Sequence, residues 1–214
     1  MNSRRPMSST GLLPHFGLSA PAMTISPPTA PSPCRQEITS KAAVRTGLPA
    51  HAAPLVGWSG MMRTIGAISD THGLLRPQAL AALAGCDPIN MPGMLAVLTY
   101  LRGSARWRLH AVRGNVDHGA WSANLPVTQR IEIDGFRIYV LHILAELDPQ
   151  AADNVDAVIY GHSHQPKIET KNGTLFFNPG SAGPRRFRLP ITVGRMTAEH
   201  GKLRAEIVEL SVER

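Results

Sequence analysis

Apolar residues recur in short blocks from Thr64 to the end of the chain, and Gly, Pro, Asn and Asp separate these blocks. Short blocks rich in branched side chains predict buried or half-buried β-strands. We expect strands at Thr64–Ile68, Leu109–Val112, Gln129–Ile133, Phe136–Leu141, Ala157–Tyr160, Lys167–Thr170, Thr174–Phe177, Ile191–Met196 and Leu203–Leu210. Apolar residues at helical spacing predict helices over Pro77–Ala84 and Met94–Leu101.

Two dipeptides that favour tight turns lie between neighbouring predicted strands. Asp134-Gly135 and Asn172-Gly173 are typical of two-residue β-hairpin turns. Helices therefore alternate with strands early in the chain, and hairpins dominate later. This order predicts an α/β fold, a sandwich of two mixed β-sheets flanked by helices.

The segment before Met62 has a different composition. Half of the 18 prolines fall there, among Ser, Thr and Ala, and no helical or strand period persists. Such a segment buries too little apolar surface to offset its ordering entropy. We expect residues 1–61 to be a disordered N-terminal extension and residues 62–214 to be the folded domain. A natural start at Met61 or Met62 is the interpretation that we favour, over a transit peptide.

Charge and cysteine content narrow the class of protein. The formal net charge is +7, but residues 1–61 hold five Lys/Arg and one acid. The remaining residues are only mildly basic, with one Arg cluster at residues 185–188, which argues against nucleic acid as a structural partner. Two isolated cysteines, Cys34 and Cys86, indicate a reducing compartment, so we expect a cytoplasmic protein. No apolar run reaches the length of a membrane span.

Four short polar motifs directly follow predicted strands. They are Asp70-Thr71-His72, Gly114-Asn115-Val116-Asp117, His142 and Gly161-His162-Ser163-His164. Taken singly, each also fits an ordinary explanation, such as a helix cap, a turn or a half-buried core histidine. Taken together, they supply the oxygen and nitrogen ligands that suit Mn²⁺, Fe or Zn²⁺. No cysteine takes part, so a structural zinc–thiolate site is not expected.

In this order, D-T-H, G-N-V-D, a lone H and G-H-S-H resemble the calcineurin-like metallophosphoesterases, and most closely their small bacterial phosphodiesterases. The run from Asn178 to Arg186 resembles the same group, and the resemblance extends from Met62 to about Arg195. The resemblance implies one metal ion held by Asp70, His72 and His164. It implies a second ion held by Asn115, His142 and His162.

The resemblance also implies an activity, the hydrolysis of phosphoesters, and of phosphodiesters in particular, by a metal-bound hydroxide at a two-metal site. Two divalent ions are expected, with Mn²⁺ first and Ni, Fe, Zn or Mg as alternatives. Asn115 and His142 are assigned to catalysis as well as to metal binding. Arg185 and Arg186 are candidates for substrate binding, and a solvated loop is an equally good interpretation of them. The expected partner is the phosphoester substrate. The sequence leaves open whether the protein forms a homo-oligomer.

The chain departs from the family in one central element, a strand ending in Gly-Asp whose aspartate bridges both metals. Here residues 85–93 read Gly-Cys-Asp-Pro-Ile-Asn-Met-Pro-Gly, and two prolines are unfavourable in a central strand. We therefore expect this strand and its Gly-Asp to be deleted, with Asp87 or Asn90 as substitutes. Val116 replaces a histidine that many members carry. The alternative function is a non-catalytic scaffold that binds a metal, a phosphate ligand or a protein partner.

Overall fold

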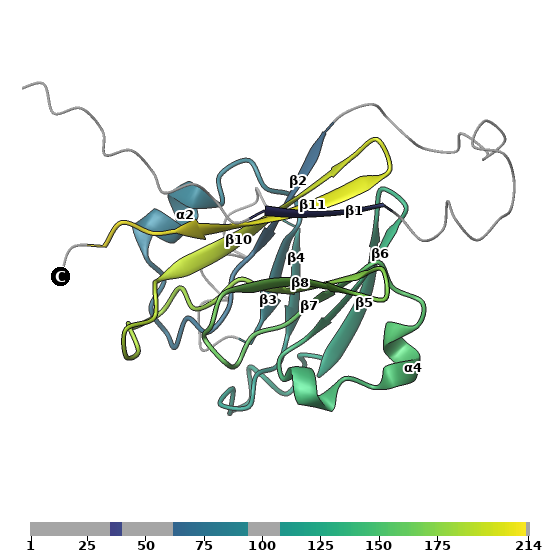
Figure 1. The fold of residues 1–214 in the computed structure, drawn as a ribbon. Helices are drawn as coiled ribbons and strands as arrows, with labels where there is room; N and C mark the ends of the chain where they lie inside the picture. Colours follow the sequence, from purple (N-terminus) through teal and green to yellow (C-terminus); the bar gives the residue numbers. More distant parts are fainter. Residues whose placement is uncertain (1–34, 40–61, 94–107, 213–214) are drawn as a thin grey trace, which may run out of the picture. The chain divides into compact units, whose positions relative to one another are not determined.

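The computed structural model describes residues 35–39, 62–93 and 108–212, and their strands form two mixed β-sheets (Figure 1). The strands of the first sheet are β1 (Arg35–Thr39), β2 (Arg63–Ala67), β3 (Ile89–Pro92), β4 (Leu109–Val112), β10 (Thr192–Glu199) and β11 (Lys202–Glu209). Their order in space is β1-β11-β10-β2-β3-β4. The strands of the second sheet are β5 (Thr128–Ile133), β6 (Phe136–Leu141), β7 (Ala157–Ile159), β8 (Lys167–Lys171) and β9 (Thr174–Asn178). They lie in the order β5-β6-β7-β9-β8.

Each sheet contains three parallel strands, which lie at one side of the first sheet and in the centre of the second, and its other strands are antiparallel. β2, β3 and β4 are parallel in the first sheet, as are β6, β7 and β9 in the second. β5 pairs with β6 through Asp134-Gly135, and β8 pairs with β9 through Asn172-Gly173. All four turn residues have positive φ, between 48° and 78°, which matches the backbone of type I′ hairpin turns. Both predicted hairpins are confirmed.

The main core lies between the two sheets, because one cluster of buried apolar side chains draws on strands of both. Its members include Ile65, Val112, Met196 and Leu203 from the first sheet and Ile138, Ile159, Leu175 and Phe177 from the second. Burying one face of each sheet against the other is the packing expected of a two-layer β-sandwich. The predicted α/β sandwich of mixed sheets is therefore confirmed.

Helices in the described ranges are short. α2 (Pro77–Ala82) has Pro77 in its first turn and ends two residues before the predicted Ala84. Ala79 and the following Leu83 pack into a second apolar cluster with Ile68 and Ile89. α4 (Pro149–Ala152) was not predicted, although Asp148 caps it by accepting a hydrogen bond from the Gln150 N–H. The helix predicted over 94–101 lies outside the described residues. No described helix is long and apolar enough to cross a membrane.

The structure differs from the predicted deletion of a central strand. Ile89–Pro92 forms β3, which is wholly buried and pairs in parallel with β2 and β4. The prolines are tolerated because neither N–H at the ends of the pairing with β4 comes from a proline: Ile89 donates to the Arg108 carbonyl and Gly93 to the Val112 carbonyl. Pro88 and Pro92 lie at the two ends of the pairing and still accept hydrogen bonds through their carbonyls. Gly93 follows β3 and Met94 comes next in the sequence, so the chain has a glycine but no aspartate directly after this strand.

Part of the segment before Met62 is ordered, which the composition did not predict. Arg35–Thr39 forms β1, an edge strand antiparallel to β11. The Gln36 side chain donates to the Ile168 carbonyl at 3.0 Å and accepts from the Thr170 hydroxyl at 3.2 Å, so it joins the two sheets. The other residues before Met62 lie outside the described ranges. Composition failed here because a five-residue strand on an existing edge needs no core of its own.

We still propose Met62 as the start of the folded domain, and truncation tests this boundary. A protein beginning at Met62 should fold and bind metal, but loss of β1 should lower its melting temperature by about 2–4 °C. Thermal unfolding of the two proteins measures the difference. The matched variant Gln36→Ala in the full chain should show a smaller loss, because it removes only the two side-chain hydrogen bonds. Failure of the truncated protein to fold would contradict the boundary.

Candidate metal centre

The four polar motifs meet because each follows a strand at the carboxyl end of a parallel group. Asp70 and His72 follow β2, and Asn115 follows β4 in the first sheet. His142 follows β6, and the loop holding His162 and His164 follows β7 in the second sheet. The carboxyl ends of parallel strands in α/β folds form one edge, where ligand sites lie. The described structure brings all six predicted ligands to this edge.

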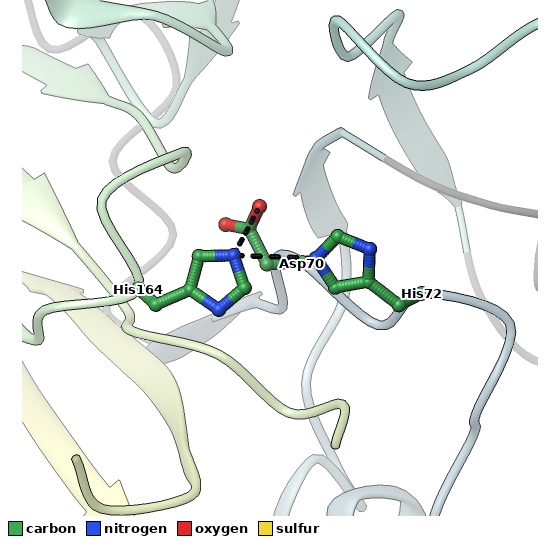
Figure 2. A group of neighbouring side chains, drawn as sticks. All are labelled: Asp70, His72 and His164. Atoms are coloured by element: carbon green, nitrogen blue, oxygen red, sulfur yellow. Dashed lines mark hydrogen bonds and ion pairs between the residues drawn. The ribbon is translucent and has the colours of Figure 1, made fainter. Parts of the chain in front are cut away.

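Asp70, His72 and His164 form a compact group (Figure 2), with one ligand atom of each lying within 4.8 Å of the others. The Nε2 atoms of His72 and His164 are 3.2 Å apart, and His164 Nε2 is 3.5 Å from Asp70 Oδ1. The two nitrogens and the carboxylate oxygen face one another, and each can offer a lone pair to a cation when both imidazoles are neutral. A divalent cation would satisfy all three, so this donor set fits a metal ion.

The electrostatics of the group favour neutral imidazoles, the form that binds metal. Burial lowers the pKa of His72, and the nearby Arg186 guanidinium lowers it further. Burial also lowers the pKa of His164, against the opposing effect of Asp70. Both rings are thus held in the state that offers a lone pair.

Asn115, His142 and His162 make a second group beside the first. His142 Nε2 lies 3.0 Å from the Asn115 Oδ1, and the His142 and His162 rings meet edge to face with centroids 5.3 Å apart. Asp70 Oδ1 joins the groups, because it is 4.0 Å from His142 Nε2 as well as near His164. Amide oxygen and imidazole nitrogen are ligand types that bind divalent metals, although this group contributes no negative charge.

Backbone conformation at the site is unusual. Asp70, His72, His162 and His164 all have positive φ, between 47° and 69°, a region that non-glycine residues rarely occupy. Such conformations cluster at functional sites, where the surrounding structure enforces them. Here Asp70 Oδ2 accepts a hydrogen bond from the His162 N–H at 2.9 Å, and this bond links the Asp70–His72 motif to the loop that holds His162 and His164.

Several supporting residues were not predicted as part of the site. Ser69 donates to the Pro92 carbonyl at 2.6 Å, and Ser181 donates to the Asp70 carbonyl at 2.9 Å. Asn178 Nδ2 donates to the Gly161 carbonyl and to the Ser163 hydroxyl, both at 3.0 Å, and thereby clamps the histidine loop. The Asn-Pro-Gly-Ser run at 178–181 was the signal in the sequence that could have predicted two of these residues. It forms part of the family resemblance, but the sequence alone assigned no role to it.

The two proposed substitutes for the bridging aspartate do not lie in the cluster. Asp87 pairs with Arg108 at 3.0 Å, and this guanidinium lowers the pKa of Asp87. Arg108 precedes β4 whereas Asn115 follows it, so Asp87 is at the opposite edge of the sheet. Asn90 is buried within β3, with its amide 3.4 Å from the Gly66 carbonyl. Among the described residues, the metal-ligand group contains one carboxylate, that of Asp70.

The two candidate arginines behave differently. Arg186 lines a cleft of about 230 Å³ together with ligands of both groups, and its Nη2 lies 3.4 Å from His72 Nε2. Arg185 points its Nη1 to the Leu189 carbonyl at 3.5 Å and is not among the residues that line the cleft. Of the pair, Arg186 alone is positioned beside the metal ligands.

Two glycines offer a matched test of how tightly the site is packed. Gly93 and Gly85 have nearly the same φ, +83° and +80°. A Cβ on Gly93 would overlap the His142 ring, whereas one on Gly85 meets nothing within 4 Å. Both alanine variants should lose about 1–2 kcal/mol from backbone strain. Gly93→Ala should lose about 1–3 kcal/mol more and also bound metal, because His142 must move. Equal melting temperatures and metal contents in the two variants would contradict this packing.

Two mixed sheets with carboxylate, amide and imidazole side chains at one edge define a metal-binding α/β sandwich. Residues 62–201 match the calcineurin-like phosphoesterase superfamily domain, and the chain belongs to this superfamily. A probable metallophosphoesterase of Methanothermobacter thermautotrophicus is 32% identical over 163 residues, with 67% of this chain and 91% of that protein covered.

Solved structures share the fold. Vps29 of Chaetomium thermophilum superposes with a TM-score of 0.59 at 21% identity, covering 71% of this chain and 91% of that one. A structure described as a novel archaeal phosphodiesterase superposes with a TM-score of 0.55 at 21% identity, covering 68% of this chain and 99% of that one. Similarity at this level of sequence identity shows a shared fold and nothing about a shared function.

Proposed function

We propose that this protein hydrolyses phosphodiesters at a metal centre, with Mn²⁺ as the preferred ion. The observation that carries the proposal is the convergence of Asp70, His72 and His164 on one point, with a second set of ligands beside them. Bound divalent ions would supply a hydroxide nucleophile near neutral pH and would withdraw charge from the phosphoryl oxygens.

The chain's own residues would then hold the metal ions and orient the phosphoester. Asp70, His72 and His164 would hold the first ion, and Asn115, His142 and His162 the second. Arg186 lines the same cleft and would neutralise charge on the phosphoryl group, because a guanidinium matches phosphate geometry. Val116 also lines the cleft, where many family members carry histidine, so no imidazole at that position would protonate the leaving group.

The charge balance of the site favours unequal metal affinities. The first group has one carboxylate, and the second has neutral ligands only. Two dications at the spacing of two-metal sites repel each other strongly, and neutral ligands offset little of that repulsion. We therefore propose that the Asp70 group binds first and that hydrolysis is slow.

A non-catalytic scaffold is the second candidate, and one observation favours it. The residue after Gly93 is Met94, where the family places the aspartate that bridges the two metals. A Vps29 of the same fold has been solved with a cyclic peptide bound, so a domain of this fold can present a peptide-binding surface. A scaffold could keep the first ion for structure alone.

Metal stoichiometry together with turnover separates the two candidates. Freshly purified protein should contain close to one tightly bound divalent ion, measured by plasma mass spectrometry. Added Mn²⁺ at high micromolar concentration should then start hydrolysis of bis(p-nitrophenyl) phosphate. Metal binding with no hydrolysis at any Mn²⁺ concentration would favour the scaffold.

His162→Ala is the sharpest test of the second group. It should lower Mn²⁺-dependent hydrolysis at least about tenfold, because it deletes a direct metal ligand. Arg130→Ala is the matched control, since Arg130 contacts the Ala151 carbonyl and the Tyr139 ring rather than the site. Hydrolysis rates at saturating Mn²⁺ compare the two. Equal rates in both variants would show that His162 is not a ligand.

A further inference from the structure

One aromatic side chain at the cleft has no role in the proposed metal chemistry. Phe187 is 92% exposed, the most exposed large apolar residue of the described chain, and it lines the cleft beside Arg186. A single exposed apolar residue is ordinary, but this ring lines the cleft of the candidate metal centre, where its flat apolar face is open to a ligand.

The backbone presents this ring outward at a further cost. Phe187 has φ +53° and lies in a turn that the Leu189 N–H closes onto the Arg186 carbonyl at 3.1 Å. Glycine or asparagine would adopt this conformation more readily. Arg76 fixes the start of the segment by donating to the Gly183 carbonyl at 3.3 Å. The turn therefore displays Phe187 from an anchored segment.

The neighbours of Phe187 define what it can bind. Arg186 and the candidate metal ligands are the polar part of the cleft lining, and Val116 and Leu189 add apolar surface to it. A ligand that matches this lining combines a phosphate with an apolar, planar group. Among the described residues, the apolar lining of the cleft consists of these three side chains, an area that suits a small planar group.

We propose that Phe187 is the stacking surface for a nucleobase, and that the substrates are phosphodiesters of nucleosides. This inference rests on the proposed phosphodiesterase function. The phosphate would lie against Arg186 and the metal ligands, and the base would lie on the Phe187 ring. Stacking on an aromatic side chain tolerates any base, because every base has a π-face. The cleft would thus favour nucleotides without selecting one base.

Calorimetric titration of the Mn²⁺-loaded full chain tests this inference without requiring turnover. The two probes are adenosine 5′-monophosphate and ribose 5-phosphate, which share sugar and phosphate and differ in the base. The wild type should bind the nucleotide about 5- to 100-fold more tightly. Phe187→Ala should abolish this ratio, and Phe187→Trp should keep it. Arg186→Ala should weaken both probes alike, since it faces the phosphate.

Trp121→Ala provides the matched control, because Trp121 is also an exposed aromatic residue and does not line the cleft. This variant should keep the wild-type ratio. Equal affinity of the wild type for the two probes would overturn the inference, and so would an affinity ratio that is unchanged in Phe187→Ala. In either case a contact with another protein would become the preferred role of Phe187. Failure of the proposed function would appear separately, as the absence of diester hydrolysis.

Discussion

Asp70→Asn should abolish metal binding while leaving the fold intact. Asp70 supplies the one carboxylate of the described metal-ligand group, and its Oδ1 faces His164. Loss of an outer-shell partner already costs about 10–100-fold in metal affinity, so loss of the anionic ligand should cost more than about 100-fold. Plasma mass spectrometry of the purified variant measures bound metal. Thermal unfolding with and without Mn²⁺ should show that the stabilisation by metal has disappeared.

The fold should survive this change for two reasons. Asparagine has the shape of aspartate and is among the residues that best tolerate the positive φ found here, +52°. Its side-chain oxygen can still accept the His162 N–H. Asp87→Asn is the matched control, since it removes an acid paired with Arg108 at the opposite edge and should leave the metal content unchanged. Full metal content in Asp70→Asn would show that the ion is bound elsewhere.

Met94→Asp should raise both the metal content and the rate of diester hydrolysis. β3 is present and ends beside the site, with Gly93 packed close to the His142 ring. One substitution therefore restores the family's Gly-Asp without insertion of a strand. A carboxylate about 4 Å from a cation contributes about 4 kcal/mol per unit charge at an effective dielectric of 20. Even a third of that would strengthen binding of the second ion about tenfold.

Met94→Asn separates charge from shape. It should leave the second ion weakly bound, because an amide oxygen brings no negative charge. Mn²⁺ titrations of the three proteins, followed by hydrolysis of bis(p-nitrophenyl) phosphate, give the comparison. Two tightly bound ions in the wild type would show that another acid already bridges. An unchanged rate in Met94→Asp, despite a second bound ion, would instead favour the scaffold.

The sequence predicted the fold well wherever local signals were strong. Both hairpins and the buried strands β2, β4, β6 and β7 follow from turn dipeptides and apolar blocks. Prediction failed for β3, because proline statistics treat each residue alone. The N–H groups of a central strand that must donate hydrogen bonds are set by the position of the neighbouring strands. Here Ile89 and Gly93 donate at the two ends of the pairing with β4, so the prolines are not required as donors there. It failed for β1 because an edge strand depends on a partner strand that is remote in sequence.

The sequence by itself determined which candidate metal ligands the chain offers and in what order, since residue type and position after a strand are local properties. The tertiary structure alone decided which of them meet, that Asp87 lies at the wrong edge, and that Arg186 rather than Arg185 reaches the cleft. It also revealed Phe187, a residue without a motif. The reason is that distances between strand ends depend on how two sheets pack, and sequence spacing carries no record of that packing.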